Sequence, residues 1–298
     1  MSLNKNISGC FMAVLALCFA GSCTDKDMNI KGQLIYRDGG GSIEAIDLES
    51  PEFSKSLVYK NKTHTHINHV DKTSDATFLF SECDLGTCTI KQYSIDLGDI
   101  RELRVGLWPS YIRGHEKMFF YERGADDTKW LFMASMKDIN EVSKIARKPE
   151  DEGFTSLTMP VIQVSPDEVI FIGEDSQLWS YNIKNSETTK TGAENCRPYL
   201  LRTKSNQILC KGQNTWAPYL LDMDKKEKIE LPEREGAYSF VYLEQIDAFI
   251  FGRTRGVVVA EIPELFLYSF TDKKETRIKK YAHMASGFWI PNGAVPSN

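Results

Sequence analysis

The sequence lacks a long apolar run, an excess of basic residues and a helical pattern, and each absence counts against a class of protein. Its longest apolar run covers residues 10–20, whereas a transmembrane helix takes about 20 residues. The net charge of -5 and the isoelectric point of about 5.7 argue against general affinity for nucleic acid or anionic lipid surfaces, which need a basic face. Helical spacing is nearly absent, residues 138–147 being the one modest candidate, which argues against a parallel α/β sheet.

Motifs typical of enzymes are missing as well. The sequence contains no nucleophile elbow, phosphate-binding loop, dinucleotide fingerprint or metalloprotease helix. We therefore predict no catalytic residue and no cofactor, and we favour a binding protein over an enzyme.

The N-terminal residues have the features of an export signal. Small residues follow the apolar run in the sequence Ala20-Gly21-Ser22-Cys23. This arrangement resembles the bacterial lipobox, whose cysteine is acylated and becomes the new N-terminus, although Ala20 stands where leucine is usual. We predict a signal peptide over residues 1–22, lipidation of Cys23 and a linker over residues 23–31, followed by one domain over residues 32–298.

The predicted location follows from this resemblance. Thr24, and not aspartate, follows Cys23, which in lipoproteins favours the outer membrane. We therefore expect the periplasmic face of a bacterial outer membrane. Cleavage after Ser22 without lipidation is the alternative, and it would give a soluble periplasmic or secreted protein.

Six repeats set the expected fold. Each has an apolar strand, a turn with Gly, Asp or Asn, and a second alternating strand, and the repeats start about 40 residues apart, the length of one four-stranded propeller blade. A further strand follows each pair and another precedes it in five of the six repeats, while residues 283–290 supply the inner strand that the first repeat lacks. We predict an all-β, six-bladed β-propeller of four-stranded antiparallel blades, with the ring closed by the C-terminal strand joining the first blade.

Four cysteines remain after the predicted cleavage and lipidation, and their places in the strands favour two disulfides. Cys83 and Cys88 flank a tight hairpin turn, and Cys196 and Cys210 flank a turn centred on residue 203. Residues directly opposed in an antiparallel pair lie within disulfide distance, and an exported protein meets an oxidising compartment. Buried thiols are the alternative, while zinc is disfavoured because neither pair has the C-x-x-C spacing.

One blade resembles a known family. Ser165-Pro166-Asp167 precedes an apolar strand, and Tyr181 and Asn182 end the next strand, which resembles the repeat of TolB-type, WD-repeat-like propellers. Glu168 stands where that repeat has glycine, and only one of the six repeats carries the motif clearly. The resemblance implies a six-bladed propeller in an exported protein, and it implies a binding module more than an enzyme.

Candidate binding residues are cations and aromatics expected near the mouth of the channel, because arginine suits anions and aromatic rings suit sugars. They are Arg113, His115, Arg197, Tyr199, Tyr238 and Trp289 on or beside inner strands, with Arg253 and Arg255 from the long loop 252–264. Three histidines, His64, His66 and His69, lie close together, but no carboxylate cluster accompanies them, so we predict no metal site.

Two functions fit these features. The favoured one is a membrane-anchored, non-catalytic binding module for an envelope protein or a glycan, with no nucleic-acid partner. The alternative is a propeller hydrolase or lyase that acts on a saccharide in the central funnel with Arg, His and Tyr side chains.

Overall fold

The computed structural model describes residues 30–39, 41–61, 64–124, 128–147, 160–193, 196–211, 218–231, 237–255, 262–280 and 282–291. The predicted signal peptide, Cys23, and most of the predicted linker lie outside these residues. Apart from strands, the described part of the chain contains two short 3-10 helices, η1 (Thr203–Ser205) and η2 (Glu244–Ile246), and no helix there has the length and hydropathy to cross a bilayer.

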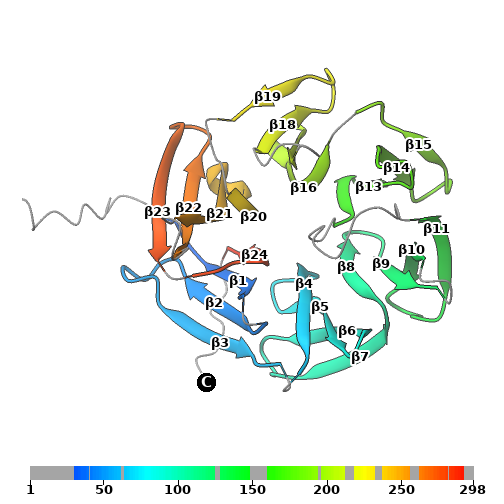
Figure 1. The fold of residues 1–298 in the computed structure, drawn as a ribbon, viewed down its shortest axis with the longest axis horizontal. Coiled ribbons are helices and arrows are strands. Elements are labelled where there is room, and N and C mark those ends of the chain that lie inside the picture. The colour runs from blue at the N-terminus through cyan, green and yellow to red at the C-terminus, as the bar shows by residue number, and fades with distance from the viewer. Residues whose placement is uncertain are drawn as a thin grey trace, which may run out of the picture.

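The strands form six antiparallel sheets of four, arranged as blades around a central axis (Figure 1). Blade 1 contains β24 (Ser286–Ile290), β1 (Gln33–Arg37), β2 (Ile43–Asp47) and β3 (Lys55–Tyr59). Blade 2 contains β4 (His66–Lys72), β5 (Thr77–Asp84), β6 (Thr87–Ser94) and β7 (Ile100–Val105). Blade 3 contains β8 (Leu107–Ile112), β9 (Lys117–Arg123), β10 (Lys129–Ser135) and β11 (Val142–Arg147).

The remaining three blades follow in chain order. Blade 4 contains β12 (Ile162–Ser165), β13 (Glu168–Ile172), β14 (Leu178–Asn182) and β15 (Thr188–Lys190). Blade 5 contains β16 (Arg197–Arg202), β17 (Gln207–Lys211), β18 (Pro218–Asp222) and β19 (Lys228–Glu230). Blade 6 contains β20 (Ala237–Leu243), β21 (Ala248–Arg255), β22 (Ile262–Ser269) and β23 (Lys274–Lys280). We call the four strands of a blade A to D from the axis outward.

The predicted ring closure is confirmed. Strand β24 is the A strand of blade 1 and pairs with β1 in an antiparallel register that sets Ile290 opposite Gln33 and Ser286 opposite Arg37. The end of the described chain thus completes the blade that its beginning starts, and the view along the axis shows a closed ring (Figure 1).

The hydrophobic core is divided among the interfaces between blades. Six clusters of buried apolar residues each join two neighbouring blades, and the sixth joins blade 6 to blade 1. Successive side chains of a strand point to opposite faces, so on β1 Leu34 and Tyr36 pack against blade 6 while Ile35 packs toward blade 2. Because neighbouring blades cover both faces of each B strand, these strands are continuous apolar runs in the sequence.

Both predicted disulfides are present. Cys83 and Cys88 are directly opposed in the β5–β6 hairpin, with Cα atoms 3.9 Å apart. Cys196 and Cys210 are joined with Cα atoms 5.0 Å apart, but the predicted face-to-face register is wrong. The turn is centred between Lys204 and Ser205, since Arg202 lies opposite Gln207, and not at residue 203. Cys210 therefore lies opposite Pro198, and Cys196 reaches it from just before the strand.

One further expectation is corrected and another is refined. The modest helical candidate at residues 138–147 is a turn followed by the outer strand β11, because pairing with β10 satisfies its backbone. Arg113, expected on or beside an inner strand, lies in the turn after β8, because that strand ends at Ile112.

Candidate functional site

A cavity of about 510 Å³ follows the axis of the ring and is the candidate functional site. Its wall is made by the six A strands, β24, β4, β8, β12, β16 and β20, together with residues at their ends. Polar and aromatic side chains line it beside apolar ones, among them His69, Asp71, Tyr111, Tyr199, Tyr238 and Trp289.

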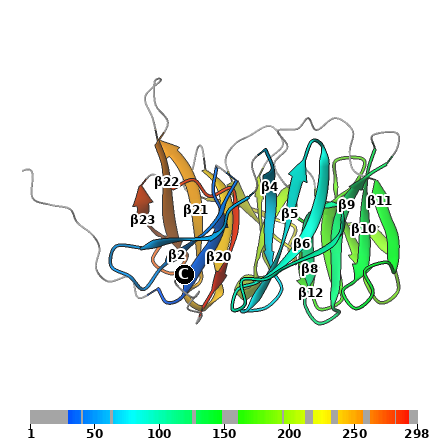
Figure 2. The ribbon, with the colours of Figure 1, turned by 90° about the horizontal axis from the view of Figure 1, so that it is seen from below.

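The two ends of this central channel are built by different connections. Every A strand starts at the end where the B–C hairpins lie, and it finishes at the end where the A–B turns lie. We call these the B–C end and the A–B end; in the side view they are the two rims of the disc (Figure 2).

A buried carboxyl group marks the A–B end. Burial raises the pKa of Asp71 to about 6, against the lowering effects of a hydrogen bond from the Tyr111 N–H and of the Arg113 charge. The Tyr111 nitrogen lies 2.6 Å from Asp71 Oδ2, which fixes the carboxylate between the inner strands of blades 2 and 3. Arg113 is exposed here and lines the cavity.

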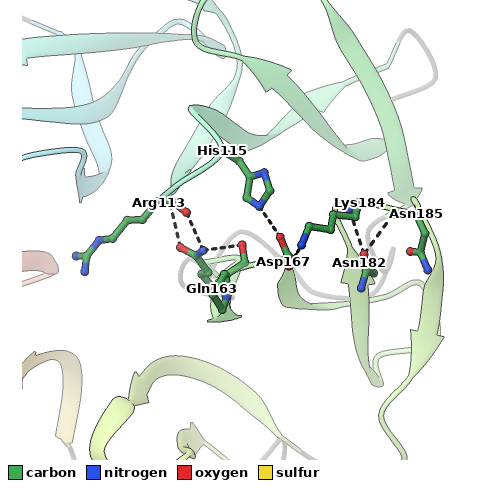
Figure 3. A network of polar contacts seen from close by, with 8 residues as sticks. Arg113, His115, Gln163, Asp167, Asn182, Lys184 and Asn185 are labelled. Carbon is green, nitrogen blue, oxygen red and sulfur yellow. Dashed lines mark hydrogen bonds and ion pairs between the residues drawn. The ribbon is translucent and has the colours of Figure 1, made fainter.

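Beside Arg113, a polar network ties blade 3 to blade 4 at the outer surface (Figure 3). His115 Nε2 lies 2.9 Å from Asp167 Oδ1, and Lys184 pairs with the other oxygen of Asp167. The hydrogen bond from Lys184, and then that from His115, hold the pKa of Asp167 below its usual value. His115 therefore holds two blades together. Arg113 joins the network through its backbone, which exchanges hydrogen bonds with the Gln163 side chain, while its own side chain points away (Figure 3).

Blades 5 and 6 are joined at the same end by a second clamp. The guanidinium of Arg202 donates to both oxygens of Asp247, and Tyr242 donates to Asp247 Oδ1 over 2.8 Å. Paired, hydrogen-bonded groups of this kind stabilise the interface and offer little to a ligand.

At the B–C end, basic and neutral polar groups gather between blades 6, 1 and 2. Arg37 ends β1 and donates to the carbonyl of Ile67 in β4. Burial, and then the Arg37 charge, lower the pKa of His69 to about 4, and the same two causes lower the pKa of His283. Both imidazoles are therefore neutral at pH 7, and the His283 ring stacks on Tyr238 with centroids 5.1 Å apart.

A second basic pair lies at the B–C end in blade 5. Arg197 and Lys211 are opposite each other across β16 and β17. Burial, and then the Arg197 charge, lower the pKa of Lys211 to about 8. This end of the channel thus carries basic residues on two blades, 1 and 5.

The sequence-predicted binding residues fall into two groups and not one. Arg197, Tyr199 and Tyr238 belong to the half of the channel toward the B–C end, while Arg113, His115 and Trp289 lie toward the A–B end. The Trp289 indole donates to the Lys31 carbonyl over 3.0 Å, so it also fastens the ring closure.

Of the two arginines expected from the long loop 252–264, Arg253 lies away from the channel lining. Arg253 ends up within blade 6, where it pairs with Glu275 and its guanidinium lies 4.1 Å from the centre of the Phe266 ring. Arg255 is the last residue of β21, and its side chain lies outside the described part of the structure, as do residues 256–261.

Three residues of the B–C end escape the sequence prediction: Arg37, His283 and Lys211. Each ends or precedes an apolar strand, where a single polar residue is usual and carries no signal of its own. Of the three clustered histidines, His64 and His66 are exposed and His69 lines the channel. Among the described residues no three His, Cys, Asp or Glu side chains are placed to share a metal ion.

Comparisons with known proteins identify the fold. No protein-family model and no curated protein matches the sequence. Solved structures do match: TolB from Acinetobacter baumannii has a TM-score of 0.66 at 11% identity, with 87% of this chain and 66% of that chain covered. A putative TolB from Agrobacterium tumefaciens has a TM-score of 0.60 at 8% identity, with 86% and 92% covered.

An enzyme is also among the similar structures. An oligogalacturonate lyase in complex with manganese matches with a TM-score of 0.50 at 12% identity, with 84% of this chain and 74% of that chain covered. At these identities the likeness establishes the fold alone, so the resemblance of the sequence to TolB-type propellers is confirmed at that level. The chain spans about two thirds of the length of the first of these TolB structures.

Proposed function

We propose that the protein is an exported, membrane-tethered propeller that binds an envelope protein or a glycan in its central channel. The observation that carries this proposal is the cavity of about 510 Å³ bounded by all six inner strands, because a concave site with a few convergent polar groups on a rigid scaffold is the usual form of a ligand site. The two disulfides suit the oxidising compartment that export would provide.

Binding in the channel is tested by placing a photo-crosslinking amino acid at Tyr199, inside the cavity, and at Leu57, exposed on an outer strand. We expect the crosslinker at Tyr199 to capture a defined envelope protein, or its crosslinking to be blocked when an envelope glycan fraction is added. We expect neither result for the crosslinker at Leu57. Equal capture at both positions would count against a channel ligand.

The tether is tested separately by the intact mass of the protein released from membranes after expression with its own signal. We expect a mass that starts at Cys23 with acyl chains added. An unmodified start at Cys23 or Thr24 would leave a soluble exported protein and would remove the anchor from the proposal.

A second candidate function is that of a lyase on an acidic saccharide, since the B–C end brings Arg37, Tyr238 and the neutral His283 together and an oligogalacturonate lyase shares the fold. In such a β-elimination a base takes the proton next to the carboxylate, the glycosidic C–O bond breaks, and the leaving oxygen takes up a proton. Formation of unsaturated uronate, followed by ultraviolet absorbance, would support this function; uncleaved oligouronides would exclude it for the substrates tried.

A further inference from the structure

The B–C end of the channel contains shielded polar atoms with no protein partner. Among the described residues, no hydrogen-bond partner is present for Arg37 Nε, His69 Nδ1, His283 Nδ1 or Ser286 Oγ, although each atom is shielded from solvent. Folded proteins pair most such atoms, because an unsatisfied buried donor or acceptor destabilises the fold. Four in one place therefore need an explanation.

These four residues are neighbours in space although they come from three separate segments of the chain. Arg37 and Ser286 are directly opposed in the β1–β24 pair, and His283 lies three positions before Ser286. The Arg37 charge acts on both His69 and His283. Ser239 Oγ donates to the Ala285 carbonyl over 2.6 Å and holds the start of β24 against blade 6.

The charge balance of the cluster is positive. Arg37 is its permanent cation, and both imidazoles are neutral at pH 7. Asp38 lies outside the four-residue cluster, and its charge acts on Arg37 and His283. Its Oδ1 accepts the Ser42 N–H over 2.7 Å in the hairpin turn, so this carboxylate is held by the turn and does not supply the acceptors that the cluster lacks. A ligand group that supplies one negative charge and several acceptors would satisfy this arrangement.

We propose that Arg37, His69, His283 and Ser286 form a carboxylate-binding subsite for the uronic acid units of an acidic glycan. This inference rests on the proposed function, whose ligand class it narrows. The Nε side of the Arg37 guanidinium, which is not engaged with the Ile67 carbonyl, pairs with the carboxylate. The neutral imidazoles and the serine hydroxyl exchange hydrogen bonds with ring hydroxyls.

Aromatic side chains at the same end favour a sugar over a peptide. Tyr238 and Tyr199 line the cavity, and each is fixed by another ring: Tyr238 by His283 and Tyr199 by Phe240, with centroids 5.1 and 5.5 Å apart. Tyrosine rings that are already fixed by packing offer a ligand an apolar face and a polar hydroxyl, and little side-chain entropy is lost when the ligand binds. A uronic acid presents a carboxylate, hydroxyls and an apolar ring face together, which matches the three kinds of group found here.

The subsite is tested by calorimetric titration of the exported protein with oligosaccharides of galacturonic, glucuronic or mannuronic acid. Each is compared with its carboxyl-reduced counterpart, which keeps the hydroxyls and loses the charge. We expect at least one acidic oligosaccharide to bind at least tenfold more tightly than its reduced form. Arg37→Gln should weaken that binding at least tenfold and Ser286→Ala several-fold, while Arg101→Gln, an exposed arginine on the outer strand β7, should leave it unchanged.

Specific results would overturn the inference. These are equal binding of acidic and reduced oligosaccharides, no effect of Arg37→Gln or Ser286→Ala, or no binding of any oligosaccharide. Binding of a glutamate-rich peptide alone, lost in Arg37→Gln, would reject the glycan and assign the cluster to a protein ligand. Arg37→Gln is used only if its near-ultraviolet circular dichroism shows that it folds. Otherwise the subsite is tested by comparing acidic with carboxyl-reduced oligosaccharides and by measuring the binding of Ser286→Ala.

The result of the oligosaccharide titration can be distinguished from the result of the photo-crosslinking test of the proposed function. Capture from Tyr199 together with no preference for acidic oligosaccharides would reject the subsite and keep the channel as a binding site. Failure of both experiments would reject both.

Discussion

Single ionisable residues inside the propeller determine how its stability responds to pH. Burial raises the pKa of Asp71 to about 6, well above the value of about 3.9 in an unfolded chain. Between these two values the folded protein holds a proton that the unfolded chain releases. Stability therefore falls as the pH rises from about 4 to 6, and the full penalty is present above pH 6.

We predict that Asp71→Asn stabilises the protein at pH 7.5 by about 1 to 3 kcal/mol, since asparagine cannot ionise and its oxygen still accepts the Tyr111 N–H. The gain should vanish near pH 4, where the wild-type carboxyl is protonated in both states. Urea unfolding at the two pH values measures the difference. A gain that is the same at both would show that the ionisation of Asp71 is not the cause.

A buried ion pair in blade 2 gives a second residue-scale prediction. Lys91 Nζ lies 2.8 Å from Glu82 Oε2, and both side chains are nearly shielded from solvent. Tyr59 also donates to Glu82 over 3.0 Å. We predict that Lys91→Met destabilises the fold by about 3 to 5 kcal/mol, because it leaves a buried charge uncompensated.

The matched test of that pair adds Glu82→Gln to Lys91→Met. The double variant should recover much of the lost stability, since a neutral amide needs no cation and its oxygen can accept from Tyr59. Urea denaturation of the wild type, the single and the double variant gives the comparison. A double variant no more stable than the single one would contradict this account.

At the scale of strands and hairpins, the two disulfides close loops of different length. Cys83 and Cys88 are 5 residues apart and Cys196 and Cys210 are 14 apart. In the chain-entropy account the longer loop contributes about 3 kcal/mol and the shorter about 2 kcal/mol. We predict that replacing Cys196 and Cys210 by alanine lowers the midpoint of urea unfolding more than replacing Cys83 and Cys88. The reverse order would argue against loop entropy as the main contribution of the disulfides to stability.

The strands also show what sequence periodicity can establish. Apolar B strands and their hairpins recur so regularly that the fold, the blade count, the closing strand and both disulfides follow from the sequence. The register of the A strands does not, because bulges in β4, β8, β12, β16 and β20 shift the pairing without changing composition. The expected pairing of Cys196 fails because the turn is centred beyond residue 203, with Arg202 opposite Gln207.

The candidate site is less accessible to sequence reasoning for the same reason. Strand alternation cannot say which face of an inner strand is turned to the channel. In addition, Arg113 follows the end of β8 whereas Arg197 begins β16, so residues that are all expected near the channel mouth lie at its opposite ends. Arg37 and His283 reach the site from the end of a B strand and from a connection, and only the closed ring brings them beside His69.

At the scale of the whole molecule, the ring closes at a junction that leaves no room for extra atoms. A Cβ on Gly287 in β24 would lie 2.7 Å from the Ile35 carbonyl oxygen, and one on Gly32 would lie 2.0 Å from the Ile290 carbonyl oxygen. Both neighbours are backbone atoms, which cannot turn aside as a side chain can.

We predict that Gly287→Ala destabilises the whole propeller, by about 2 kcal/mol or more, because overpacking at a closed junction strains the backbone on both sides. Ile100→Ala, at an exposed position on the outer strand β7, should change stability by less than about 0.5 kcal/mol. Thermal unfolding followed at the tryptophans measures both. A wild-type melting curve for Gly287→Ala would mean that β24 does not carry the closure.

The position of the closing strand in the sequence also determines when blade 1 is completed during synthesis. On the ribosome β1 is the first strand of the propeller to appear and β24 the last, so blade 1 stays short of its inner strand throughout elongation. Until Ile290 emerges, the β1 edge that will accept β24 is open to any other strand nearby, and Arg37 is paired through β2 alone. A chaperone or protease that recognises this open edge would distinguish a prematurely ended chain from a finished one at a single blade.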